Sequence, residues 1–122
     1  MAHILVVDDD RATVSLLTML LEMDGFQVSQ SPLPKIVLEK ARASAVDAFV
    51  VDCHLGGFNG LDLLRDIRRD ADLATKFVIV TSGNDLAQEA MAAGADFFML
   101  KPFSPNMLSA KLAEFLSPPE DE

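Results

Sequence analysis

Residues 3–10, HILVVDDD, form an apolar run that ends on three consecutive aspartates. Three further runs also end on a reactive polar residue: AFVV precedes Asp52, KFVIV precedes Thr81, and FFML precedes Lys101. Short runs rich in β-branched and aromatic residues, bounded by polar residues, predict buried β-strands. The pattern therefore predicts four strands whose carboxyl ends carry acids, a hydroxyl and an amine.

Segments of helical periodicity separate these strands, and a fifth strand is predicted early in the chain. A helix that Asp10 caps and Gly25 ends is predicted from the helical spacing of Val14, Leu17, Leu20 and Leu21. The five strands are expected at 3–7, 26–30, 48–51, 77–80 and 97–100. Four more helices are expected at 34–43, 61–69, 85–93 and 105–116.

This alternation of strands and helices is typical of an α/β domain with a doubly wound parallel sheet. The central runs FVV and FVIV are continuously apolar, as expected of parallel strands covered by helices on both faces. Right-handed crossovers restrict the strand order, and the common five-stranded solution is the flavodoxin-like order 2-1-3-4-5. There the winding reverses between strands one and three, which opens a ligand-binding crevice at their carboxyl ends.

The composition indicates one acidic domain. The chain has 122 residues and a formal net charge of −9, which suffices for one core and argues against nucleic acid or a membrane surface as a direct partner. No apolar run reaches the roughly 18 residues of a transmembrane helix, and no signal peptide is indicated, so we expect a cytoplasmic location. The single cysteine, Cys53, excludes an internal disulfide and is expected to be a buried, unreactive side chain.

The domain is expected to span residues 1–117. Two prolines then break the last helix, and the chain turns acidic. Residues 118–122 are therefore either a solvated tail or the start of a linker.

Asp8, Asp9 and Asp52 are expected at the crevice, together with Thr81 and Lys101 from the next two strands. Each pair of ionised carboxylates at ~4 Å costs roughly 1 to 4 kcal/mol, so a cation is needed to offset the repulsion. Mg²⁺ favours one or two carboxylates, several waters and a substrate phosphate oxygen. Beside a cation and a lysine, a carboxylate can attack phosphorus and form an acyl phosphate. Asp52 is the predicted nucleophile, because the other two acids are better placed to hold metal.

Four motifs give residues 3–116 a family resemblance. They are the acidic doublet in ILVVDDD, an aspartate with a glycine eight residues later (Asp52 to Gly60), the hydroxyl in VIVTSG and the lysine–proline pair in LKPF. In this order and spacing they resemble the receiver domain of response regulators in two-component signal transduction. The resemblance implies a signalling phosphoacceptor that catalyses only its own phosphorylation and dephosphorylation, and that switches a protein–protein surface.

The resemblance also implies a role for each polar residue of the crevice. Asp52 would accept a phosphoryl group from a sensor histidine kinase or a histidine phosphotransfer protein in a phosphorelay. Mg²⁺ or Mn²⁺ would be bound by the side chains of Asp9 and Asp52 and by the backbone carbonyl of His54. Asp8 would act on the metal through water, and Lys101 would pair with a phosphoryl oxygen.

A switch is implied as well. Thr81 would donate its hydroxyl to a second phosphoryl oxygen, and Phe98 occupies the aromatic switch position. The switched face would comprise the fourth helix, fifth strand and fifth helix, and would bind a downstream protein or form a dimer on phosphorylation. The bond from Lys101 to Pro102 is expected to be cis. One departure is Gly56, which stands where the family usually has proline.

Three other functions fit parts of the pattern. A small aspartyl-phosphate phosphatase would share the nucleophile, but such hydrolases tend to carry a second acid where His54 stands. A flavodoxin-like cofactor binder would share the fold, but its first loop should offer donors to a phosphate, which the aspartates at 8–10 would repel. A degenerate receiver would act only as a protein-binding module, which the complete set of pocket residues disfavours.

Overall fold

The chain folds into three layers, with a parallel β-sheet between two sets of helices. The computed structural model describes residues 2–31 and 34–116. The main sheet contains β1 (His3–Val7), β2 (Gln27–Gln30), β3 (Ala48–Asp52), β6 (Phe77–Ser82) and β7 (Phe97–Leu100). Its strands are all parallel, in the order β2-β1-β3-β6-β7. This confirms the predicted order 2-1-3-4-5.

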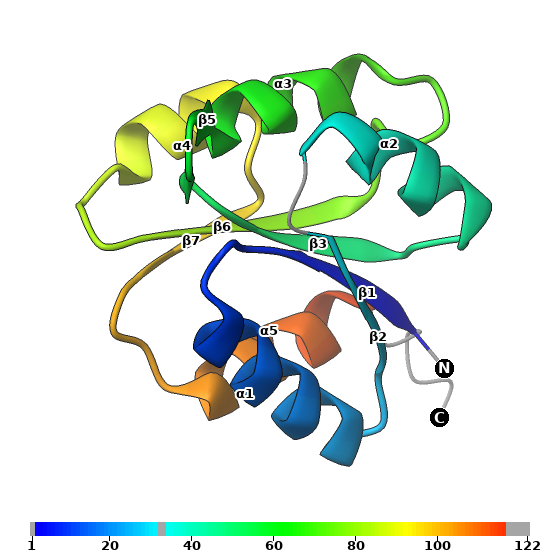
Figure 1. Cartoon of the computed structure of the whole chain (residues 1–122), viewed down its shortest axis with the longest axis vertical. Helices are drawn as coiled ribbons and strands as arrows, with labels where there is room; N and C mark the ends of the chain where they lie inside the picture. The colour runs from blue at the N-terminus through cyan, green and yellow to red at the C-terminus, as the bar shows by residue number, and fades with distance from the viewer. Residues whose placement is uncertain (1, 32–33, 117–122) are drawn as a thin grey trace.

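Five helices cover the sheet, as predicted. α1 (Arg11–Met23) and α5 (Pro105–Leu116) lie on one face (Figure 1). The opposite face is covered by α2 (Pro34–Ala43), α3 (Gly60–Arg69) and α4 (Ala87–Ala93). Among the described residues, no helix has the length and apolar character needed to cross a membrane. The expected tail at 118–122 lies outside the described residues.

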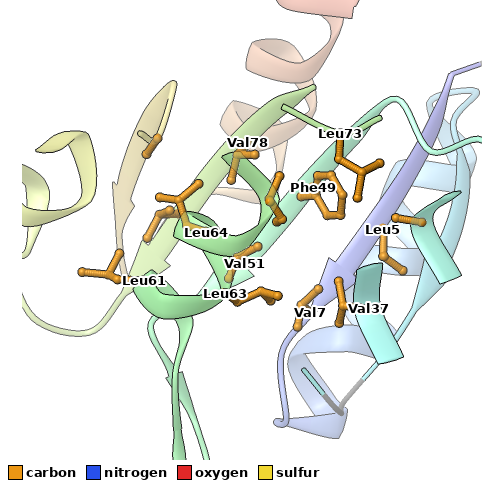
Figure 2. Close-up of a cluster of buried hydrophobic side chains, with 14 of the residues drawn as sticks. Leu5, Val7, Val37, Phe49, Val51, Leu61, Leu63, Leu64, Leu73 and Val78 are labelled. Atoms are coloured by element: carbon orange, nitrogen blue, oxygen red, sulfur yellow. The ribbon is translucent and has the colours of Figure 1, made fainter. Parts of the chain in front are cut away.

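The sheet divides the core into two clusters, because successive side chains of a strand point to opposite faces. In β3, Phe49 and Val51 pack toward α2 and α3, whereas Val50 packs toward α1 and α5. Figure 2 shows Phe49 and Val51 on the same side of the sheet as Leu64 of α3. Phe49 and Leu64 are fully buried, and burying a side chain of this size contributes about 1.5 to 3 kcal/mol. Burial on both faces explains why AFVV shows no polar alternation.

Polar side chains and left-handed residues set the helix ends. The Asp10 carboxylate accepts a hydrogen bond from the backbone N–H of Ala12 at 3.3 Å, which caps α1 as predicted. Gly94, with φ of +113°, ends α4. α4 begins at Ala87, two residues later than predicted. The Asp85 carboxylate accepts a hydrogen bond from the Ala87 N–H, so this turn uses the aspartate as a local acceptor instead of extending the helix.

A short antiparallel hairpin after β3 was not predicted. It consists of β4 (His54–Leu55) and β5 (Phe58–Asn59), joined through Gly56 and Gly57. Gly56 has φ of +64°, a left-handed conformation that proline cannot adopt. Two-residue strands carry no periodicity, so sequence patterns do not find them. The glycine in place of the family's usual proline thus produces an ordered turn beside the crevice.

Candidate functional site

Three strand ends meet at the carboxyl edge of the sheet. Val7 is in register with Val51, so Asp8 follows β1 directly beside the end of β3. Asp52 is in register with Thr81 of the neighbouring β6. Both β3 and β6 extend beyond their predicted ends, so these two residues belong to the sheet itself. The main chain therefore fixes the position of the Asp52 and Thr81 side chains.

The three acids form one cluster. One carboxylate oxygen from each of Asp8, Asp9 and Asp52 lies within 4.8 Å of the other two. Asp8 and Asp52 are each only 6% exposed, whereas Asp9 is exposed to solvent. Carboxylate oxygens are the ligands that Mg²⁺ and Mn²⁺ prefer, and an exposed side leaves room for waters and a phosphate oxygen. The donor set fits such a cation.

Lys101 neutralises part of this charge. Its Nζ lies 3.1 Å from Asp8 Oδ2 and 3.2 Å from Asp52 Oδ2. Burial alone would lower the pKa of Lys101, but the Asp52 and Asp8 carboxylates together outweigh it and raise that pKa. The lysine is therefore charged at neutral pH. Its backbone N–H donates to the Ser82 carbonyl at 2.7 Å, and its peptide bond to Pro102 is cis.

The fold raises the pKa of Asp52. Burial raises the pKa of its carboxyl; Lys101 opposes this shift and Asp8 adds to it. The backbone N–H of His54 also points to Asp52 Oδ1, at 3.4 Å. Because the folded state holds the Asp52 proton more tightly than the unfolded chain does, the ionised carboxylate lowers the stability of the fold at neutral pH.

We expect Asp52→Asn to raise the unfolding midpoint of the metal-free chain at neutral pH by roughly 4 °C, or about 1 kcal/mol, because the neutral amide avoids the cost of burying a charged carboxylate. A raised folded-state pKa means that the parent loses stability as pH rises from the unfolded value of 3.8 through the folded value. The difference in unfolding midpoint between Asp52→Asn and the parent should therefore grow as pH rises between these two pKa values, and it should disappear at lower pH. Thermal melts of both proteins with EDTA, from acid to neutral pH, measure it, and identical midpoints at every pH would contradict it.

The loops around the cluster bring four further residues close to it, His54, Gly56, Gly60 and Asn84. A Cβ on Gly56 would lie 3.4 Å from Asp9 Oδ2, so the hairpin turn lies against that carboxylate. His54 Nε2 and Asn84 Nδ2 lie 3.4 Å apart, which brings the hairpin and the β6–α4 loop together. Gly60 approaches the backbone of Asp52 so closely that a Cβ would lie 2.1 Å from its carbonyl oxygen. Of these four residues, the sequence had singled out His54, Gly56 and Gly60, but not Asn84.

The two expected switch residues lie in neighbouring strands, Thr81 in β6 and Phe98 in β7. Thr81 is buried at the end of β6, next to the cluster. Phe98 of β7 is partly buried and packs against the core cluster that contains Phe49 and Val51. Leu86 packs against the same cluster. The Cys53 thiol is buried, and burial followed by the charge of Asp52 raises its pKa. This supports the interpretation of Cys53 as an unreactive side chain.

An apolar groove of about 420 Å³ adjoins the cluster at Lys101. Leu16 and Leu17 of α1 line one wall, and Pro102 and Phe103 line the other. Such a groove can accept the apolar side chains of a protein partner. Its position beside the lysine would bring that partner close to Asp52.

The chain resembles known proteins in sequence and in fold. The family model of the response regulator receiver domain matches residues 4–113. The DNA-binding response regulator MtrA of Mycolicibacterium smegmatis is 34% identical over 122 residues, which cover 98% of this chain and 53% of that protein. YvrH, a transcriptional regulatory protein of Bacillus subtilis, is 30% identical over 116 residues, or 94% of this chain and 49% of that protein. The chain thus spans about half the length of the curated relatives it matches.

A crystal structure of a response regulator from Thermotoga maritima has the same fold. It superposes with a TM-score of 0.83 at 29% identity, and the superposition covers 97% of this chain and 99% of that one. The similarity therefore extends over the whole sheet and its helices.

Proposed function

This chain belongs to the response regulator receiver domain family, and we propose that its Asp52 accepts a phosphoryl group from a phosphohistidine. The observation that carries the proposal is the position of Lys101 Nζ, 3.1 Å from Asp8 and 3.2 Å from Asp52, within a cluster of three carboxylates. If Lys101 served only a structural ion pair, one carboxylate would suffice, and the other two carboxylates would only add repulsion. The excess of acids over bases is what a cation-assisted phosphoryl site requires.

The transfer would proceed at the exposed side of the cluster. An oxygen of the Asp52 carboxylate attacks phosphorus, the new O–P bond forms, and the P–N bond of the phosphohistidine breaks with its electron pair returning to the imidazole. Lys101 would pair with a phosphoryl oxygen, and Thr81 would donate its hydroxyl to another. Mg²⁺ or Mn²⁺ held by Asp9, Asp52 and the His54 carbonyl, with Asp8 reached through water, would supply charge neutralisation at the phosphoryl oxygens.

The proposed site implies two kinds of protein partner, a phosphoryl donor and a downstream target. We propose a sensor histidine kinase or a histidine phosphotransfer protein as the donor, with its apolar side chains in the groove between α1 and the loop after Lys101. The phosphoryl charge at Asp52 would shift the β6–α4 loop through Thr81 and alter the packing of Phe98. That change would switch the face of α4, β7 and α5 toward a downstream protein or a second copy of the chain.

We propose no direct contact between this domain and nucleic acid, because its net charge of −9 repels phosphate backbones. MtrA is named a DNA-binding protein, and this chain matches 53% of it. If the chain is part of a longer protein, residues 1–117 form the receiver, and DNA contact would belong to a further domain. Turnover of external phosphate esters is not expected.

Incubation with Mg²⁺ and acetyl phosphate, followed by intact mass measurement, tests the proposed function. We expect one phosphoryl group per chain, and no gain when EDTA replaces Mg²⁺. Asp9→Asn, which keeps the shape of the side chain but removes its charge, should need about tenfold more Mg²⁺ for half-maximal labelling. No labelling under conditions that label a known receiver would favour the protein-binding module, and rapid hydrolysis of a generic phosphate ester would favour the phosphatase.

A further inference from the structure

Arg68, near the carboxyl end of α3, ties two separate segments, 74–76 and 94–96, to that helix. Its Nε donates to the Gly94 carbonyl at 2.8 Å, and its Nη2 pairs with Asp96 Oδ2 at 2.9 Å. Its Nη1 donates to the carbonyls of Ala74 and Lys76 at 2.9 and 2.7 Å. A guanidinium holds its donors in one rigid plane, so these contacts fix the segments relative to α3. They lie at the edge of the sheet opposite the acidic cluster.

The Arg68 contacts hold the carboxyl end of α4 in particular. Gly94 ends α4 with φ of +113°, and a Cβ there would lie 2.9 Å from Arg68 Cγ. The stem of the arginine therefore lies directly against the last turn of the helix. Asp96 Oδ2 also accepts from the Val78 N–H at 2.8 Å, and the Asp96 N–H donates to the Val78 carbonyl at 2.9 Å. The end of α4 is thus attached to both α3 and β6.

The amino end of α4 is held much less. Its N-cap residue, Leu86, makes no side-chain capping bond. The loop before it, 83–85, is exposed. Three polar contacts hold this loop. The Asn84 N–H donates to Ser82 Oγ at 3.0 Å, the Ala87 N–H donates to the Asp85 carboxylate at 3.3 Å, and Asn84 Nδ2 lies 3.4 Å from the His54 ring. The first two are local, and the third is long.

We propose that Arg68 is a positioning residue that makes Gly94 a hinge, so that α4 pivots about its carboxyl end when its amino end is displaced. The displacing pull is that of Thr81 toward the phosphoryl group on Asp52, so this part of the inference rests on the proposed function. A helix of seven residues is about 10 Å long. A small movement of the loop at 83–86 would therefore tilt α4 and leave the start of β7 in place.

Hydrogen exchange of the unphosphorylated chain tests the hinge itself. Arg68→Met keeps most of the side-chain stem and removes the four donated bonds. We expect amides 94–96 to lose about tenfold of their protection, while those of β3 are unchanged. In Arg68→Lys, the protection of amides 94–96 should lie between that of the parent and that of Arg68→Met. Arg65→Met is the matched control on the same helix, because among the described residues Arg65 pairs only with the exposed Asp62, at i,i+3. Equal protection at 94–96 in the parent and Arg68→Met would overturn the proposal.

The pivot is tested by repeating the exchange with Mg²⁺ and beryllofluoride, a stable substitute for the phosphoryl group. In the parent we expect the change in exchange to fall on 83–89 and to leave 94–96 unaltered within about twofold. In Arg68→Met, labelling by acetyl phosphate should stay within about twofold of the parent, but the change should spread to 94–96. The same exchange pattern in both proteins would overturn the pivot. A parent that takes up no phosphoryl group would instead contradict the proposed function, and the comparison of unphosphorylated chains would still decide the hinge.

Discussion

Asp52→Asn is expected to lose phosphoryl incorporation from acetyl phosphate by at least ~100-fold, because an amide is not a nucleophile toward phosphorus. The substitution also weakens the cation site, which loses one of its three clustered carboxylates. Asparagine has nearly the shape of aspartate, and Asp52 makes no contact that requires its charge except those with Lys101 and the clustered acids. The fold should therefore persist, and the loss should come from the missing nucleophile and the weaker cation site, not from unfolding.

Intact mass measurement after incubation with Mg²⁺ and acetyl phosphate gives the labelled fraction directly. Asp66→Asn is the matched control, because Asp66 is an exposed aspartate on α3 outside the cluster. It should be labelled as the parent is. If Asp52→Asn and the parent gain the same mass, the acceptor is another residue, and the proposed chemistry at Asp52 is wrong.

Gly60→Ala is expected to destabilise the fold by about 2 to 4 kcal/mol. The new Cβ would lie 2.1 Å from the Asp52 carbonyl oxygen and 2.9 Å from its carbonyl carbon. Both atoms belong to β3, which is buried and paired on both sides, so neither can move away at low cost. Alanine is the better helix former by roughly 1 kcal/mol, which is too little to offset the clash. Any relaxation must also shift Asp52, so phosphoryl incorporation should fall with stability.

Gly57→Ala is the control for this substitution. A Cβ at Gly57 would have no heavy atom within 4 Å, and Gly57 does not have a left-handed φ. Its free energy of unfolding should change by less than about 0.5 kcal/mol. Denaturant unfolding of the parent and the two variants measures both effects. A free energy of unfolding for Gly60→Ala within about 0.5 kcal/mol of the parent would contradict the close approach of Gly60 to β3.

The fold and the site could be predicted from the same local signals. Runs such as AFVV and FVIV mark buried parallel strands, and a parallel sheet with short crossovers brings the ends of its strands to one edge. Residues 8, 52, 81 and 101 therefore come together although they are distant in the chain. This strand order makes β3 and β6 neighbours, and their register in the structure sets Asp52 beside Thr81.

Other features depend on contacts that no local pattern contains. The hairpin at 54–59 has strands of two residues, too short for any periodicity. The hydrogen bonds of Arg68 to Gly94 and Asp96 join positions 26 and 28 residues apart, and in the sequence Arg68 is simply one of several charged residues on α3. The burial that raises the pKa of Asp52 likewise exists only after three layers have packed.

The interior position of β1 has a consequence for synthesis on the ribosome. β1 lies between β2 and β3, and its pairing with β3 joins Ile4 to Ala48 and Val7 to Val51. A nascent chain must therefore hold HILVV without its second partner until about 44 more residues have been added, roughly 2 to 9 s at ordinary translation rates. During that interval the edge of β1 that later pairs with β3 is available to chaperones and to other nascent chains.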